Sequence, residues 1–234
     1  MMSIIGALVG FIYRAFFLKG EEGFRLASPW VKLLFLASSI YLLTRQGLLP
    51  ALANIATVLA LSLIWPGLEW FTSGFIISLI PALWFSATAY VSWLLGLPGV
   101  DFTGALNILA RTISISLTIL FSASTISPVR LSNILLRIGA PSYYPLLVWR
   151  TMPYGMRVLL DSVEIGVMKG EKPHKRLAPA VAIMLEYGSY VEEYNWFKFE
   201  GKPAAPLPSR GSMKHTLILA VASALEIALG VLFL

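Results

Sequence analysis

The chain has 234 residues, of which 57% are hydrophobic and 13% are charged, and its formal net charge is +6. Soluble domains carry about 25% charged residues, so this composition, with a mean hydropathy of +0.77, predicts an integral membrane protein. Cysteine is absent and there are only 2 histidines, which excludes a disulfide framework and a cysteine- or histidine-rich metal centre. We therefore expect no cofactor, and no nucleic-acid partner.

The first apolar stretch covers residues 3–18 and contains Arg14 near its end. It is slightly shorter than the roughly 20 residues that a bilayer requires. We interpret it as an interfacial or loosely embedded helix. The alternative, a true first span, places the N-terminus on the opposite side of the membrane.

Five later stretches reach spanning length or come near it. They cover residues 33–48, 49–65, 74–95, 104–125 and 215–234. Gly47 and Pro50 favour a tight turn between the first two, and residues 66–73 are expected to form a loop. The fold class predicted is an all-α membrane protein with about five transmembrane helices.

The distribution of basic residues predicts the orientation. No Lys or Arg lies between Arg45 and Arg111, whereas residues 130–214 hold twelve of the 18. Because Lys and Arg accumulate in cytoplasmic loops, we expect residues 130–214 and the N-terminus in the cytoplasm and the C-terminus outside. The predicted localisation is the plasma membrane, with several passes.

The segment between the fourth and fifth spans has the periodicity of helices. Within residues 142–170, apolar residues recur at steps of three and four and charged residues mark another face, which predicts an amphipathic helix of about seven turns. We expect three regions: residues 1–126 with the interfacial helix and four spans, 127–213 with cytoplasmic helices, and 214–234 with the last span.

Two shorter amphipathic helices are predicted beside this long one. The preceding helix has Ser127 as N-cap, Pro128 at its first position and Gly139 as a stop before Pro141. The following helix begins at Pro179 and carries four glutamates, namely Glu186, Glu192, Glu193 and Glu200. Such helices either rest on lipid headgroups or pack against protein, and the glutamates favour a protein partner.

A resemblance to a known family lies in residues 110–170, ARTISISLTILFSASTISPVRLSNILLRIGAPSYYPLLVWRTMPYGMRVLLDSVEIGVMKG. This run resembles the transmembrane T component of energy-coupling factor (ECF) transporters, a family of ABC transporters. The family has a Thr-rich span end, a Pro-started short helix, a Gly-x-Pro break, an Arg-x-x-Pro helix and a terminal Ala-Arg-Gly. The counterparts are Thr125, Pro128, Gly139-Ala140-Pro141, Arg150 with Pro153, and Met168-Lys169-Gly170. The sequence SPWVKLL at 28–34 likewise resembles the family's entry to the first span.

The resemblance implies a coupling subunit that is not itself an enzyme. Its long amphipathic helices dock onto two cytoplasmic ABC-type ATPases and also carry a membrane S component, which binds the substrate. Closing of the ATPases then topples the S component and releases a vitamin or a metal ion. Because another subunit binds the substrate, this sequence does not specify it.

The docking residues that the resemblance implies lie at two helix ends. They are Met168, Lys169 and Gly170 at the first, and Lys198, Glu200 and Gly201 at the second. Lys169 keeps the charge of the family's arginine but lacks its guanidinium, whereas Glu200 occupies the second arginine position when the glycines are aligned. A cation beside a glycine cap suits insertion into a groove on a partner, although Lys169-Gly170 as a simple C-cap is the alternative.

The long helix contains a proline in its interior. Pro153 is expected to kink the helix, because it removes a backbone donor and crowds the preceding turn. Arg150 either bonds the freed carbonyls or extends to water, and Arg157 marks the same charged face. Together with Gly139 and Pro141, these residues are predicted to shape the coupling helices.

The fourth span carries a polar stripe at steps of three or four, which is predicted to hold helices together. Its members are Asn107, Arg111, Ser114, Thr118, Ser122 and Thr125. Arg111 in this stripe needs a partner, because an unpaired arginine costs about 2.5–3.5 kcal/mol at mid-bilayer. Glu226 lies at a similar depth in the last span, so an ion pair is our hypothesis. Arg111 bonded to backbone carbonyls, or Glu226 facing the interface, are the alternatives.

Two other function classes are weighed against the coupling subunit. A lipid-modifying membrane enzyme is disfavoured, since the chain has no P-loop, H-E-x-x-H, paired aspartate cluster or G-x-S-x-G. A stand-alone permease is expected to show inverted repeats and broken helices, and only Pro81 suggests a break.

Overall fold

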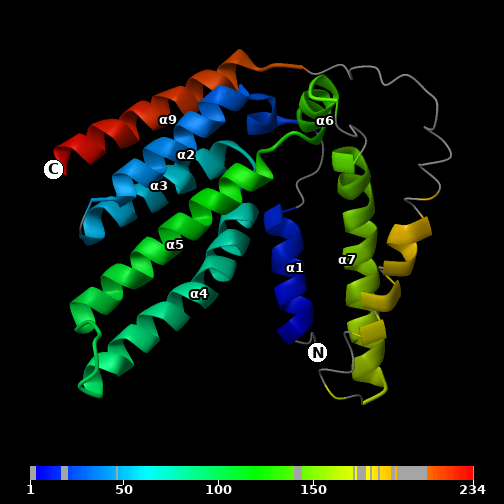
Figure 1. The fold of residues 1–234 in the computed structure, drawn as a ribbon, viewed down its shortest axis with the longest axis horizontal. Coiled ribbons are helices and arrows are strands. Elements are labelled where there is room, and N and C mark those ends of the chain that lie inside the picture. The colour runs from blue at the N-terminus through cyan, green and yellow to red at the C-terminus, as the bar shows by residue number, and fades with distance from the viewer. Residues whose placement is uncertain are drawn as a thin grey trace. The chain divides into compact units, whose positions relative to one another are not determined.

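The computed structural model is all-helical over the residues that it describes, and no strand occurs among them (Figure 1). The described residues are 4–16, 21–45, 47–139, 144–170, 172, 178, 179, 181–183, 185–190, 193 and 210–233. The predicted all-α class is confirmed for this part of the chain. Two compact units are formed: the first unit comprises Met1–Tyr13 and Ser127–Ser209, and the second unit comprises Arg14–Ile126 and Arg210–Leu234.

The second unit contains five apolar helices and one short 3-10 helix. They are η1 (Gly23–Leu26), α2 (Pro29–Leu43), α3 (Leu48–Ile64), α4 (Leu68–Leu94), α5 (Phe102–Ser124) and α9 (Met213–Leu232). Helix α4 packs along α5, and α2 packs along α9 (Figure 1). Helix α3 contacts α5 as well, so α5 has neighbours on several sides.

Three described helices, α4, α5 and α9, are long and apolar enough to cross a membrane. Helices α2 and α3 are apolar but have only 15 and 17 residues. The structure therefore describes a membrane protein with three candidate spans, and the expected count of about five stays a prediction. Helix α4 continues through Pro81.

The loop expected at residues 66–73 is mostly helix, and that prediction is wrong. Helix α4 begins at Leu68, directly after Gly67, whose φ of 115° is a backbone conformation that glycine adopts without strain. Trp70 and Ser73 in the first turns of α4 are buried. These first turns of α4 form because their side chains are buried in the core. The local pattern of turn-forming residues does not reveal such burial.

The core of the second unit is built around the ring of Phe121. Phe24, Phe35 and Trp70 meet this ring edge-on, with centroid distances of 5.6, 5.7 and 5.6 Å. Edge-to-face packing of this kind is the favourable geometry for aromatic pairs. It joins η1, α2 and α4 to α5.

The first unit contains α6 (Pro128–Arg137), α7 (Tyr144–Met168) and the beginning of α1 (Ile4–Phe16). The predicted start of α6 is confirmed, since Ser127 Oγ accepts a hydrogen bond from the Arg130 amide at 3.2 Å and Pro128 follows. Gly139 has a φ of 73° after the helix, as expected for a glycine stop. The described residues between 178 and 193 are also helical.

Candidate functional site

The predicted first docking end is an exposed helix terminus. Met168 is 82% exposed, and Lys169 and Gly170 are exposed as well. The Lys169 amide still bonds the Ile165 carbonyl at 2.9 Å, and Gly170 then takes a φ of 67°. The predicted glycine cap is therefore present, and a cationic side chain lies directly before it.

A groove of about 280 Å³ lies beside this end of α7 within the first unit. Its lining combines apolar side chains with two opposite charges and comprises Val158, Asp161, Ser162, Ile165, Gly166, Lys169, Pro179 and Ile183. Such a surface offers an apolar floor for a side chain of a partner. Lys169 adds a cation that can pair with an acidic residue.

The other predicted coupling residues are only partly described. Helix α7 is continuous through Pro153, and Arg157 is exposed; the kink at Pro153 stays a prediction. The predictions for Pro141, Lys198, Glu200, Gly201 and the side chain of Arg150 lie outside the described residues.

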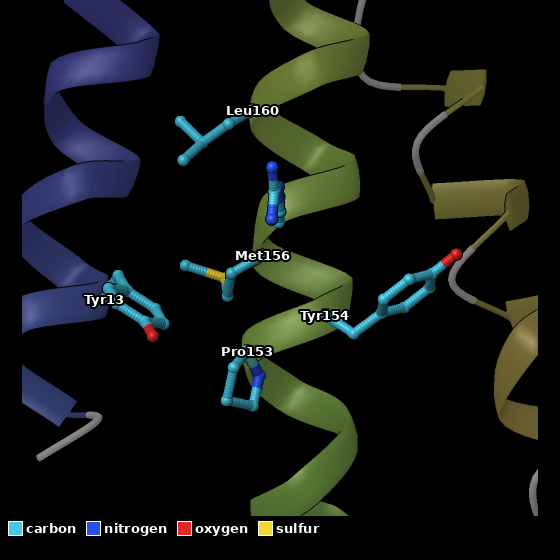
Figure 2. Close-up of a pocket in the computed structure, with 6 residues that line it drawn as sticks. Tyr13, Pro153, Tyr154, Met156 and Leu160 are labelled. Carbon is cyan, nitrogen blue, oxygen red and sulfur yellow. The ribbon is translucent and has the colours of Figure 1, made fainter. Parts of the chain in front are cut away.

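A second hollow, of about 440 Å³, lies between α1 and α7 in the first unit. Figure 2 shows Tyr13 on α1 directed toward α7, where Pro153, Met156 and Leu160 face it. Arg157 also lines this hollow. This hollow was not predicted from the sequence, because it depends on where Tyr13 lies relative to α7.

Tyr154 also lines this hollow, and its ring projects from α7 away from Tyr13 (Figure 2). Its ring lies 4.3 Å from that of Tyr187, centroid to centroid. This contact ties the middle of α7 to the helical residues between 178 and 193, so the first unit has a defined partner for α7.

Glu226 on α9 is a fully buried acidic residue of the second unit, at 0% exposed. Its Oε2 accepts hydrogen bonds from Ser38 Oγ at 2.8 Å and Ser39 Oγ at 2.7 Å. Its Oε1 accepts one from Asn54 Nδ2 at 3.1 Å. A single carboxyl thus joins α9 to α2 and α3.

Asn54 extends this set of hydrogen bonds to a fourth helix. Its Oδ1 accepts from Ser114 Oγ at 2.8 Å and from Thr118 Oγ1 at 2.9 Å, both on α5. We call Ser38, Ser39, Asn54, Ser114, Thr118 and Glu226 the polar junction. The predicted role of the α5 stripe in holding helices together is confirmed for Ser114 and Thr118.

Arg111 and Glu226 have different partners, so the hypothesis of an ion pair between them is wrong. Arg111 Nη2 donates to the Leu43 carbonyl at the end of α2, which is the alternative considered for it. The free carbonyls at a helix C-terminus attract a cation. Glu226 instead finds neutral donors, because α2 and α3 place hydroxyl and amide groups around it.

Two basic residues bind the C-terminal end of α5. Arg25 Nε donates to the Ser124 carbonyl at 3.1 Å, and Lys32 Nζ donates to the Thr125 carbonyl at 2.7 Å and to the Arg25 carbonyl at 3.0 Å. Burial lowers the pKa of Arg25 to about 10, opposed by the charge of Glu21, so Arg25 stays charged at neutral pH. The end of α5 is thereby fixed to η1 and α2.

The N-terminal end of α5 is capped by Asp101. Its carboxylate accepts from Thr103 Oγ1 at 2.6 Å and from the Gly104 amide at 2.8 Å. These hydrogen bonds, that of Thr103 first, lower the pKa of Asp101 below its ordinary value of 3.8. Both ends of α5 therefore have side-chain partners.

Ser38, Ser39 and Asn54 were not predicted from the sequence as partners of Glu226. A usable signal was present, since Asn54 is the one carboxamide within the α3 sequence. A buried acid requires donors from neighbouring helices, and polar residues inside apolar runs are where such donors must be sought.

No family model, curated protein or solved structure matches this chain. Its class is therefore given by the fold: an all-helical membrane protein, over the described residues, with three helices of spanning length and a separate unit of amphipathic helices.

Proposed function

We propose that this chain is the transmembrane coupling subunit, or T component, of an ECF-type ABC importer in the plasma membrane. In this role it docks two cytoplasmic ATPases and a substrate-binding S component, so that ATP hydrolysis drives uptake of a vitamin or a metal ion. It contributes no catalytic residue itself. Its N-terminus and its amphipathic helices lie in the cytoplasm.

The observation that carries the proposal is that α6 and α7 belong to a different compact unit from α2, α3, α4, α5 and α9. Residues 127–209 cluster in the first unit, and α7 alone has 25 residues. At about 1.5 Å per residue this helix is roughly 37 Å long. A helix of this length is more consistent with a part that transmits movement than with a segment that only connects two spans.

The end of α7 supports docking at this place. Lys169 is exposed beside the Gly170 cap and lines the 280 Å³ groove with Ile165 and Ile183. An apolar floor with a cation at its edge has the composition expected of a protein interface, in which apolar contacts are bordered by charge.

The fixed end of α5 supports the coupling part of the proposal. The chain passes from α5 into α6 through residues 125–127, and the Ser124 and Thr125 carbonyls are held by Arg25 and Lys32. Because the C-terminal end of α5 is held in this way, a movement of the amphipathic helices is transmitted to α5. If this end of α5 were frayed, local unfolding would take up the movement.

Co-purification tests the proposal. The full chain, solubilised in detergent, is captured with candidate ABC-type ATPases, and recovery is compared for the wild type, Lys169→Glu and Lys172→Glu. We expect Lys169→Glu to reduce recovery about tenfold, because one interfacial charge is reversed, and the matched change at Lys172 to leave it unchanged. The double variant Lys169→Glu, Lys198→Glu is expected to abolish recovery.

Two results would contradict the proposal at different levels. Equal recovery of wild type and double variant removes Lys169 and Lys198 from the docking surface. No recovery of any cognate ATPase with the wild type, in a preparation that is folded by circular dichroism, contradicts the coupling function as a whole.

A further inference from the structure

The cleft between α1 and α7 has the composition of a site for an amphiphile. One wall is Tyr13, and the other is formed by residues of α7, namely Pro153, Tyr154, Met156, Arg157 and Leu160. Pro153, Met156 and Leu160 lie on the side of α7 that faces Tyr13 (Figure 2). The cleft's volume of about 440 Å³ falls within the range of about 300–1,000 Å³ that is usual for small-molecule sites. The cleft lies wholly within the first unit.

Arg157 supplies the charge of this cleft. No ion pair of Arg157 with a carboxylate is found within the described part of the chain. Asp161, the next acidic residue along α7, lines the other groove together with Lys169. The guanidinium of Arg157 is therefore available to an anion, and its planar donors match the oxygens of a phosphate.

We propose that the cleft binds one anionic phospholipid, with the phosphate at Arg157 and an acyl chain along Pro153, Met156 and Leu160. A soluble anion would leave these three apolar side chains uncovered, whereas a lipid satisfies the cation and the apolar wall together. The inference depends on the membrane character of the chain and not on the docking of ATPases. Failure of the co-purification test therefore leaves it intact.

Lipid titration of the full-length chain tests this site. The chain is purified in detergent, depleted of lipid and titrated separately with short-chain phosphatidylglycerol, short-chain phosphatidylcholine and inorganic phosphate, and native mass spectrometry measures the bound fraction. We expect one phosphatidylglycerol to bind at least tenfold more tightly than phosphatidylcholine. Inorganic phosphate is expected to bind weakly or not at all.

Four variants locate the binding. Arg157→Gln is expected to weaken phosphatidylglycerol binding about tenfold, and Met156→Trp, which fills the cleft, by a similar factor. Arg137→Gln removes an exposed cation on α6 outside the cleft and should leave binding unchanged. If Arg157→Gln does not fold, Arg157→Lys, which keeps the charge but loses the planar donors, is expected to bind a few-fold more weakly.

Three results would overturn the inference. They are equal binding of the two lipids, binding of inorganic phosphate as tight as that of phosphatidylglycerol, and equal loss of binding in the Arg137 variant and in the cleft variants.

Discussion

Replacing Glu226 by alanine removes the acceptor at the centre of the polar junction. Three donors contact this carboxyl, but Ser38 Oγ also lies 2.9 Å from the Phe35 carbonyl and keeps an acceptor there. Ser39 and Asn54 Nδ2 lose theirs. A buried donor without an acceptor costs about 1–3 kcal/mol, whereas hydrogen bonds between membrane helices average about 0.6 kcal/mol and reach about 1.7 kcal/mol.

We therefore expect Glu226→Ala to lower the free energy of unfolding by about 2–4 kcal/mol, which is two donors at one to two kcal/mol each. Glu226→Gln keeps one carbonyl acceptor and should cost roughly half as much. Reversible unfolding in mixed micelles, followed by circular dichroism or tryptophan fluorescence, measures the difference.

Ser223→Ala is the matched control on the same helix. Ser223 is buried, but its hydroxyl bonds only the Leu219 carbonyl of α9, at 2.8 Å, so its loss should cost less than about 1 kcal/mol. A cost of Glu226→Ala no larger than that of Ser223→Ala would show that the polar junction contributes no stability between helices.

Other predictions concern helix ends and packing. Lys32→Met, which removes a cation from two backbone carbonyls, should destabilise the chain by about 1.5–3 kcal/mol in the same unfolding assay; an unchanged transition would contradict the role of Lys32 in fixing α5. Gly230→Ala places a Cβ 2.6 Å from Tyr41 Cε1 and should cost about 1–3 kcal/mol by overpacking. Gly10→Ala serves as the tolerated control, because beyond its chain neighbours and its own helix backbone no atom lies within 4 Å of the added Cβ. The pKa of Asp101 is lower in the folded chain than its ordinary value of 3.8. The cap therefore stabilises the fold above pH 3.8, and this contribution is lost as the pH falls through the folded pKa. Thermal unfolding between pH 5 and 2 should show this loss in the wild type and not in Asp101→Asn.

Much of the helix pattern was predictable, because it depends on local rules. Ser127, Pro128 and Gly139 bound α6 as predicted, since caps, fixed φ angles and left-handed stops act within one turn of chain. The break at Gly47 between α2 and α3 follows from the same chemistry. The start of α4 was not predictable in this way, because Trp70 is helical on account of its place in the core.

The hydrogen-bond partners of the polar groups required tertiary structure. Arg111 and Glu226 were correctly identified as groups that need partners, yet depth along two spans is a one-dimensional measure and does not give the rotation of either helix. Rotation decides that Arg111 meets the Leu43 carbonyl and that Glu226 meets Asn54.

Hydropathy, helical period and capping residues are local properties of the chain. They were enough to predict a helical membrane protein with a basic, amphipathic segment between its last two apolar stretches. The tertiary structure was needed to show that one buried carboxyl on α9 binds side chains of α2 and α3, that Asn54 extends these hydrogen bonds to α5, and that Tyr13 and Arg157 line one cleft. Burial and hydrogen bonding depend on which faces of helices distant in the sequence come into contact, and local sequence patterns do not specify those contacts.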